Sequence, residues 1–138
     1  MSHSRASIEI ARPAADVFPW LLEPEKRVLW VSGLVSSEPL GEGGYREVVE
    51  QAGLHVVVTA TVERADEPHA LDVRMRGRGV TARAESRLEE RDGITQLTSS
   101  LDLRLGGLAR LAGGVASRQT QRSLEQSLAR LKALLEAA

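Results

Sequence analysis

A row of leucines near the C-terminus most strongly limits how this chain can fold. Leu124, Leu128, Leu131 and Leu135 are spaced at i, i+4, i+7 and i+11, which places them on one face of an α-helix. No proline interrupts residues 108–137, so the pattern predicts one helix there, about 45 Å long. A helix of that length with one apolar face requires a broad surface to pack against.

The first half of this predicted helix differs from the second. Gly113, Ser117 and Thr120 continue the leucine stripe, whereas Leu108 lies roughly on the opposite side. Two interpretations stay open. Either Gly113-Gly114 kinks or breaks the helix, or the small residues leave room for a bound molecule.

Composition narrows the class of protein. The 138 residues are 42% hydrophobic and 27% charged, as in a globular chain, and we expect residues 1–138 to form one domain. A formal net charge of −1 argues against nucleic-acid binding. There is no cysteine, no signal segment before Ile8 and no apolar run of membrane length. We therefore expect a cytoplasmic monomer or homodimer that does not insert into membranes.

The N-terminal third predicts a strand followed by two short helices. Residues 4–11 alternate around Ile8 and Ile10. Pro13 suits the first turn of a helix, and Pro19 keeps that helix short or kinks it. A second short helix is expected over residues 25–30.

The middle of the chain predicts six further strands. Asp92-Gly93 is a strong two-residue hairpin signal, and the other connections are also short. The strands should therefore form an antiparallel meander. Their expected ranges are 34–40, 44–51, 54–65, 70–78, 80–91 and 94–105.

The last three strands alternate between a polar and an apolar face. Arg74, Arg76 and Arg83 lie on the polar face, which predicts solvent on that side. The other face should be covered by the C-terminal helix, the only element large enough to do so. This face also carries small side chains, at Ala60, Ala82, Ala84, Ser86 and Ser99. Small residues permit either a closely packed helix or a cavity, and a long curved sheet favours the cavity.

The order and spacing of several segments resemble the helix-grip fold of the START/polyketide-cyclase superfamily, also called SRPBCC. The segments are IEIARPAADVFPWLLEPEKRVLW, the Gly-Glu-Gly-Gly turn, ATVERADEPHAL, GITQLTSSLDL and the closing SLARLKALLE. The resemblance implies an α+β fold. A seven-stranded, curved antiparallel sheet would wrap around a long C-terminal helix, with two short helices between the first and second strands.

The resemblance also implies an apolar cavity between sheet and helix. Members of the superfamily bind lipids, sterols, quinones, polyketides or plant hormones, and they share no catalytic motif. We expect a small hydrophobic molecule as ligand and no cofactor. The predicted cavity residues are Trp30, Val58, Ala60, Val73, Met75, Ala84, Ser86, Ser99, Leu101, Ser117 and Thr120.

Few residues suggest chemistry beyond binding. The three histidines lack metal-ligand spacing, and no glycine-rich loop opens a helix, so we expect neither a metal nor a nucleotide site. Polar candidates for the mouth of the cavity are Tyr45, Glu47, His55, Gln119 and Arg122. Glu47 with His55 would be an acid–base pair for cyclisation or dehydration, but an outward, solvent-facing position is favoured for both. Trp30 suits either the cavity rim or the core.

Three functions remain open. The first is a non-catalytic carrier or sensor of an apolar small molecule. The second is a polyketide cyclase or dehydratase, and the third is an accessory protein that docks on a larger enzyme. The sequence favours the first because the predicted inner face is almost entirely apolar or weakly polar. No residue is assigned a catalytic role, and fold alone does not decide function.

Overall fold

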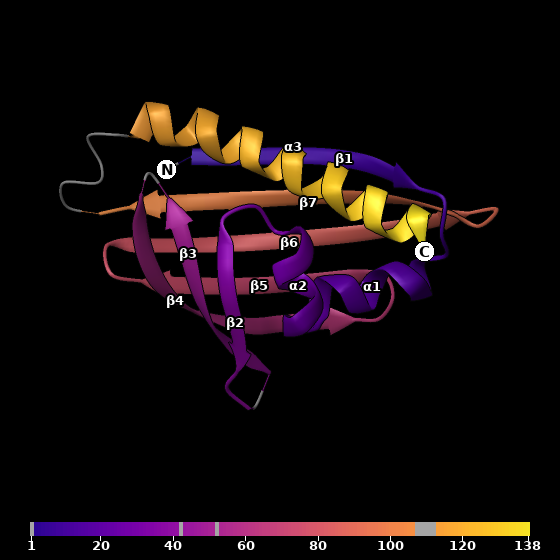
Figure 1. Cartoon of the computed structure of the whole chain (residues 1–138), viewed down its shortest axis with the longest axis horizontal. Coiled ribbons are helices and arrows are strands. Elements are labelled where there is room, and N and C mark those ends of the chain that lie inside the picture. Colours follow the sequence, from indigo (N-terminus) through magenta and orange to yellow (C-terminus); the bar gives the residue numbers. More distant parts are fainter. Residues whose placement is uncertain (1, 42, 52, 107–112) are drawn as a thin grey trace.

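The computed structural model describes residues 2–41, 43–51, 53–106 and 113–138, without the side chains of 51 and 113–117. Three helices and seven strands follow one another along the chain (Figure 1). In chain order they are β1 (Ser2–Ile10), α1 (Ala14–Leu22), α2 (Pro24–Trp30), β2 (Leu34–Pro39), β3 (Gly44–Gln51), β4 (Leu54–Asp66), β5 (Ala70–Gly77), β6 (Val80–Arg91), β7 (Ile94–Leu105) and α3 (Gly113–Ala137).

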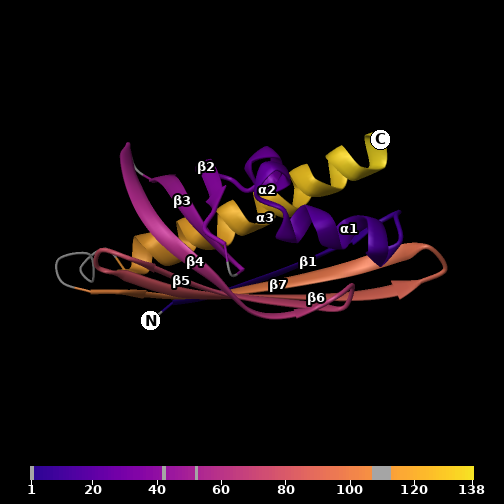
Figure 2. The same cartoon turned by 90° about the horizontal axis from the view of Figure 1, so that it is seen from below.

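All seven strands form one antiparallel sheet in the order β1-β7-β6-β5-β4-β3-β2. The sheet is curved, and β2 and β3 bend toward the side that carries the helices (Figure 2). Asp92 and Gly93 have φ values of 55° and 78°, the left-handed conformation that a tight hairpin requires at both positions. The predicted α+β helix-grip fold is confirmed, including the two short helices between the first two strands.

The inner face of the sheet is covered by three helices rather than by α3 alone. The prediction that the C-terminal helix would cover this face by itself was wrong. The helix α3 packs along β1, at one edge of the sheet, whereas α1 contacts β6 and β7 and α2 contacts β2. A helix held at the edge leaves the central strands to other elements, and the two short helices occupy that space (Figures 1 and 2).

The leucine stripe of α3 is buried as its spacing predicted. The exposed fractions of Leu128, Leu131 and Leu135 are 2%, 0% and 4%, and all three belong to the hydrophobic core. Leu124 is only partly buried. The helix begins at Gly113, and the predicted segment at residues 108–112 lies outside the described residues.

The helix α1 is nine residues long and contains Pro19, so the prediction of a short helix is confirmed. Its buried side chains include Val17, Phe18 and Leu21. They meet Leu97 of β7 and Leu131 of α3 in the same core cluster. This packing fixes α1 above the middle of the sheet, and α2 follows directly.

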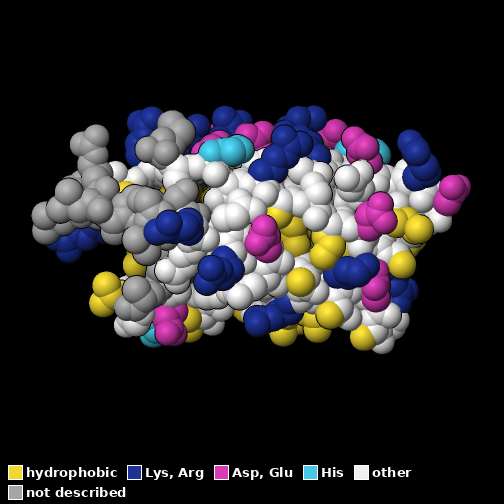
Figure 3. Space-filling view, turned by 90° about the horizontal axis from the view of Figure 1, so that it is seen from above, with side chains coloured by type: hydrophobic (Ala, Val, Ile, Leu, Met, Phe, Trp, Pro, Cys, Tyr) yellow, Lys and Arg dark blue, Asp and Glu magenta, His cyan; other side chains and the backbone are white. Residues whose placement is uncertain are grey.

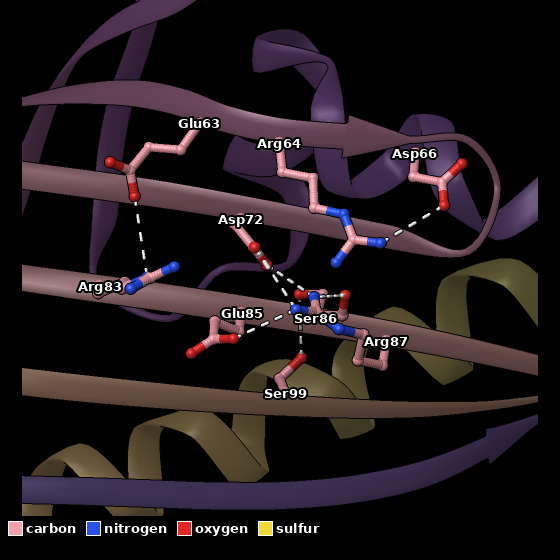
Figure 4. Close-up of polar contacts among 9 residues, drawn as sticks. All are labelled: Glu63, Arg64, Asp66, Asp72, Arg83, Glu85, Ser86, Arg87 and Ser99. Carbon is pink, nitrogen blue, oxygen red and sulfur yellow. Dashed lines mark hydrogen bonds and ion pairs between the residues drawn. The ribbon is translucent and has the colours of Figure 1, made fainter.

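The outer face of the sheet is charged. Arg74 and Arg83 both lie near Glu63, and Arg87 pairs with Asp72 and Glu85. The side chains of Arg83, Glu85 and Arg87 extend from the side of the strands opposite to α3 (Figure 4). Seen over α3 and β1, the surface mixes charges of both signs with smaller groups of hydrophobic side chains (Figure 3).

Candidate functional site

The eight predicted cavity residues that belong to the sheet all lie on its inner face. Cross-strand pairing places Val73, Ala84 and Leu101 in one row over β5, β6 and β7. Ser86 and Ser99 form the neighbouring row, and their hydroxyl oxygens lie 3.4 Å apart. The remaining members on this face are Val58, Ala60 and Met75.

Five of the predicted residues surround one small recess. The helices contribute Leu21, Arg27 and Trp30, and the sheet contributes Leu71, Val73, Met75, Ala84 and Ser86. The recess has a volume of about 40 Å³, which gives room for a few water molecules. Trp30 belongs to the core and lines the recess, and its indole N–H donates to the carbonyl oxygen of Trp20 at 2.8 Å. Trp30 therefore packs in the core, and its place at the rim of a ligand cavity stays a prediction.

A second space is larger and opens to the surface. It has a volume of about 570 Å³ and lies between α3, the turn before β2, and β3. The helix presents only polar side chains to it, from Gln119, Thr120, Ser123 and Gln126. The Ser127 hydroxyl accepts the backbone N–H of Ser32 at 2.8 Å, which ties α3 to the turn before β2. Of Gly113, Ser117 and Thr120, only Thr120 has a described side chain, and it lines this cleft, so the second interpretation of this helix stays a prediction.

The structure thus divides the predicted cavity residues between two places. Thr120 lines the large cleft, whereas Ala84 and its neighbours line the recess, and the two spaces share no lining residue. Val58 and Ala60 are buried and Leu101 is partly exposed. The side chain of Ser117 lies outside the described residues.

A buried ion pair borders the recess through one of its members, Arg27. Arg27 Nε and Nη2 each donate to one carboxylate oxygen of Glu47, both at 3.0 Å. Ser37 Oγ donates to the same carboxylate at 2.8 Å, and Arg27 Nη1 donates to the carbonyl oxygen of Leu21 at 3.2 Å. The guanidinium also lies 5.4 Å from the centre of the Tyr45 ring. The side chains of Arg27 and Glu47 are 12% and 2% exposed.

The sequence prediction for Glu47 was therefore wrong. We expected this carboxylate to face solvent, but it points to the inner face beside Tyr45. The β3 sequence contains two adjacent valines, Val48 and Val49, so either face of the strand could have been the apolar one. Arg27 was not singled out at all. Its position three residues before Trp30, on the same face of α2, was the available signal.

The other polar candidates do not gather at the recess. His55 is exposed, as expected, and lies 3.6 Å from Glu50. Gln119 lines the large cleft, and Arg122 is exposed on α3. Glu47 and His55 therefore do not form an acid–base pair. Within the described residues, no three His, Cys, Asp or Glu side chains are grouped as a metal site would require.

A family model described as "Polyketide cyclase / dehydrase and lipid transport" matches residues 1–136. The chain belongs to this family. Members of the polyketide cyclase/dehydrase and lipid transport family have the SRPBCC or START-like fold, and membership points to hydrophobic-ligand binding or cyclase-like chemistry. In the described part of this family member, no helix has the length and apolarity needed to cross a membrane.

Solved structures share the architecture over nearly the whole chain. A START superfamily protein from Mycobacterium smegmatis has 16% identity and a TM-score of 0.86, covering 99% of both chains. A protein from Thermus thermophilus has 17% identity and a TM-score of 0.85, covering 98% of this chain and 97% of its own. A conserved protein from Geobacillus kaustophilus has 23% identity and a TM-score of 0.73, covering 98% and 95%. These likenesses show the fold alone, and a comparison with curated proteins gives no match.

The phenol of Tyr45, which lies beside the Arg27–Glu47 ion pair, provides a spectroscopic test of the site. Tyr45 donates its hydroxyl hydrogen to the carbonyl oxygen of Leu22. Burial raises the pKa of Tyr45 above its ordinary value of 10.0, partly offset by the nearby Arg27. The folded protein therefore holds this proton more tightly than the unfolded chain. The resulting stability is present at neutral pH and is lost as the pH rises above 10.0.

Tyr45 is the only tyrosine in the chain, so the tyrosinate absorbance reports on this residue alone. We expect its ionisation midpoint to lie above pH 10.0 in the folded protein and to return to that value in urea. Equal midpoints in the two conditions would contradict the buried position of the phenol.

Proposed function

We propose that this chain acts as one domain that binds a small, mostly apolar molecule between the inner face of its sheet and its helices, and carries that molecule without transforming it. The main support is the partial exposure of apolar side chains on a covered face. Met75 and Ala84 line the recess beside α1 and α2, and Leu101 pairs with Ala84 on the same face, yet each keeps part of its surface accessible. In a fully packed interior such residues would be buried.

The two spaces suggest how a ligand would lie. The recess is too small for a complete ligand, since pockets for small organic molecules have volumes of about 300–1,000 Å³. The larger cleft falls within that range. We propose that the polar part of the ligand lies in the cleft and that its apolar part extends over the inner face toward Ala84. Arg27 would then be the charged group nearest to the apolar end.

Cyclase or dehydratase activity has less support. Such chemistry requires a base or acid with a proton to exchange. The Glu47 carboxylate accepts three hydrogen bonds, two of them from Arg27 and one from Ser37, so both of its oxygens are already engaged within the protein. A guanidinium keeps its proton at any ordinary pH. The ion pair is therefore suited to holding α2 against β3 and to presenting donors, and less suited to proton transfer.

Filling the recess tests this proposal. We expect Ala84→Leu to lower the affinity for dansyl-labelled undecanoic acid sharply, because the added isobutyl group occupies space that the ligand would use. Its free energy of unfolding should change little, since apolar atoms added to accessible space gain dispersion contacts and leave water. Fluorescence titration and urea unfolding measure the two quantities.

Ala129→Leu is the matched control, because Ala129 is exposed on α3 and the same atoms are added away from both spaces. This variant should bind the probe like the parent protein. If Ala84→Leu instead costs about 1–3 kcal/mol, the usual cost of overpacking, and the parent binds no probe, the proposal is wrong. The protein would then have to act through its surface.

A further inference from the structure

A groove on the outer face of the sheet gathers more positive charge than its neighbours neutralise. It has a volume of about 340 Å³ and lies over β5, β6 and β7, on the face opposite to the row of Val73, Ala84 and Leu101. Six polar side chains line it. They are Arg74, Arg76, Thr81, Arg83, Asp102 and Arg104.

Strand register arranges these side chains in two rows. Arg76 lies opposite Thr81, and Thr81 lies opposite Arg104, so one row consists of a hydroxyl flanked by two guanidiniums. Since neighbouring strands are about 4.8 Å apart, the backbones of the two arginines are about 10 Å apart. Both side chains are long enough to meet above Thr81. Two residues along, Arg74 lies opposite Arg83.

The two rows differ in their counter-charges. Arg74 and Arg83 lie 3.0 and 3.8 Å from the Glu63 carboxylate, and Asp102 lies 2.5 Å from His3. Arg76 and Arg104 are exposed, and neither makes an ion pair within the described part of the chain. By contrast, Arg87 on the same face pairs with Asp72 at 2.6 Å and with Glu85 at 3.2 Å (Figure 4).

The row Arg76–Thr81–Arg104 is therefore suited to an anionic ligand. Arg76 and Arg104 lie on β5 and β7, and Thr81 of β6 stands between them in the same row. Carboxylates lie beside Arg74, Arg83 and Arg87 on this face, whereas the row Arg76–Thr81–Arg104 contains two cations and a hydroxyl donor. An anion with about two negative charges and several acceptor oxygens would complement this row.

We propose that this groove binds the phosphate group of a phosphate monoester. A phosphate monoester carries about −1.5 to −2 charges at pH 7 and three acceptor oxygens. Arg76 and Arg104 supply the forked donors that pair with phosphate, and the Thr81 hydroxyl donates to a remaining oxygen. The groove is separated from the inner face by the sheet itself, so this site is independent of the ligand proposed there.

A phosphate monoester group occurs both in small metabolites and in the headgroup of some lipids. Glycerol 3-phosphate represents the free monoester, and vesicles of phosphatidylcholine with phosphatidic acid represent the lipid. Titration of the full-length protein with glycerol 3-phosphate at constant ionic strength should shift the Thr81 amide resonance and the Nε–H resonances of Arg76 and Arg104, with saturation. Co-sedimentation with the vesicles, without saturable shifts from the free compound, would assign the site to the headgroup.

Substitutions of single arginines distinguish a specific phosphate site from a general attraction between the anion and the positively charged surface. We use whichever of the two, glycerol 3-phosphate or the phosphatidic acid vesicles, binds the parent protein. Arg76→Gln and Arg104→Gln should each weaken its binding about tenfold, since the loss of one charge-assisted hydrogen-bonded pair lowers affinity by about that factor. Arg76→Lys keeps the charge but loses the fork, so it should bind between the parent and Arg76→Gln. Arg91→Gln is the matched control. Arg91 is exposed on the same face of β6 at its opposite end, and its removal should leave binding unchanged.

Weakening by Arg91→Gln as large as that by Arg76→Gln would show attraction to net charge only. The absence of saturable shifts and of sedimentation with phosphatidic acid would show that the groove binds no phosphate monoester. All four substitutions are at exposed positions, so the variants should remain folded.

Discussion

Glu47→Ala is expected to destabilise the protein by about 3–5 kcal/mol, the usual cost of removing one partner of a buried ion pair. The substitution would leave the Arg27 guanidinium between α2 and β3 without its carboxylate, where only 12% of the side chain reaches solvent. Ser37 would also lose its acceptor. Urea unfolding of the parent and the variant measures the difference.

Glu50, which lies on β3 like Glu47 but belongs to an exposed pair, gives the matched control. Glu50 lies 3.6 Å from His55, and both side chains are more than half exposed. Glu50→Ala should therefore change the free energy of unfolding by less than about 0.5–1 kcal/mol. Equal effects of the two substitutions would contradict the burial of the Arg27–Glu47 pair.

The double variant Arg27→Met/Glu47→Leu separates the cost of an unpaired charge from the value of the pair. Apolar replacement of both partners is often neutral or stabilising, because it removes two desolvated charges together. We expect this variant to recover most of the stability lost in Glu47→Ala. If the pair also orients a ligand, the double variant should remain stable but lose affinity for the probe.

Most of the sheet could be predicted because its local signals agree with one another. The ranges predicted for β6 and β7, 80–91 and 94–105, match the structure at both ends. There, polar and apolar residues alternate without ambiguity, and Asp92-Gly93 fixes the hairpin. The leucine stripe of α3 was predictable for a similar reason, since a helical period of apolar residues has one buried side.

The site was harder to predict because it depends on contacts between distant elements. Which way Glu47 points is decided by Arg27, which lies 20 residues earlier and on another element. The sequence also placed Ala84, Ser86 and Ser99 on the inner face without showing how much space they would leave. That space depends on where α1 and α2 lie over the sheet, and no local pattern encodes the distance between a helix and a strand.

Leu131→Ala should have the other large effect, a loss of about 2–5 kcal/mol. Leu131 is on the side of α3 that packs into the core, and it is fully buried there. The helix itself packs along β1. Truncation removes contacts on every side and leaves a cavity that the surrounding β-sheet and α1 can fill only in part. Leu128 is buried almost as completely, so Leu128→Ala should fall in the same range.

Leu29→Ala is the control for these truncations, because Leu29 is 51% exposed on α2 and its loss should cost less than about 0.5 kcal/mol. Urea unfolding of the three variants therefore tests whether the C-terminal half of α3 is held by its leucines.

The large cleft is bordered by the other half of the helix, from Gln119 to Gln126. A destabilised Leu131→Ala that still binds the probe would show that one half of α3 anchors the helix while the other half leaves the binding space open. Losses below about 0.5 kcal/mol for both Leu128→Ala and Leu131→Ala would mean that the leucine stripe does not hold α3 in place.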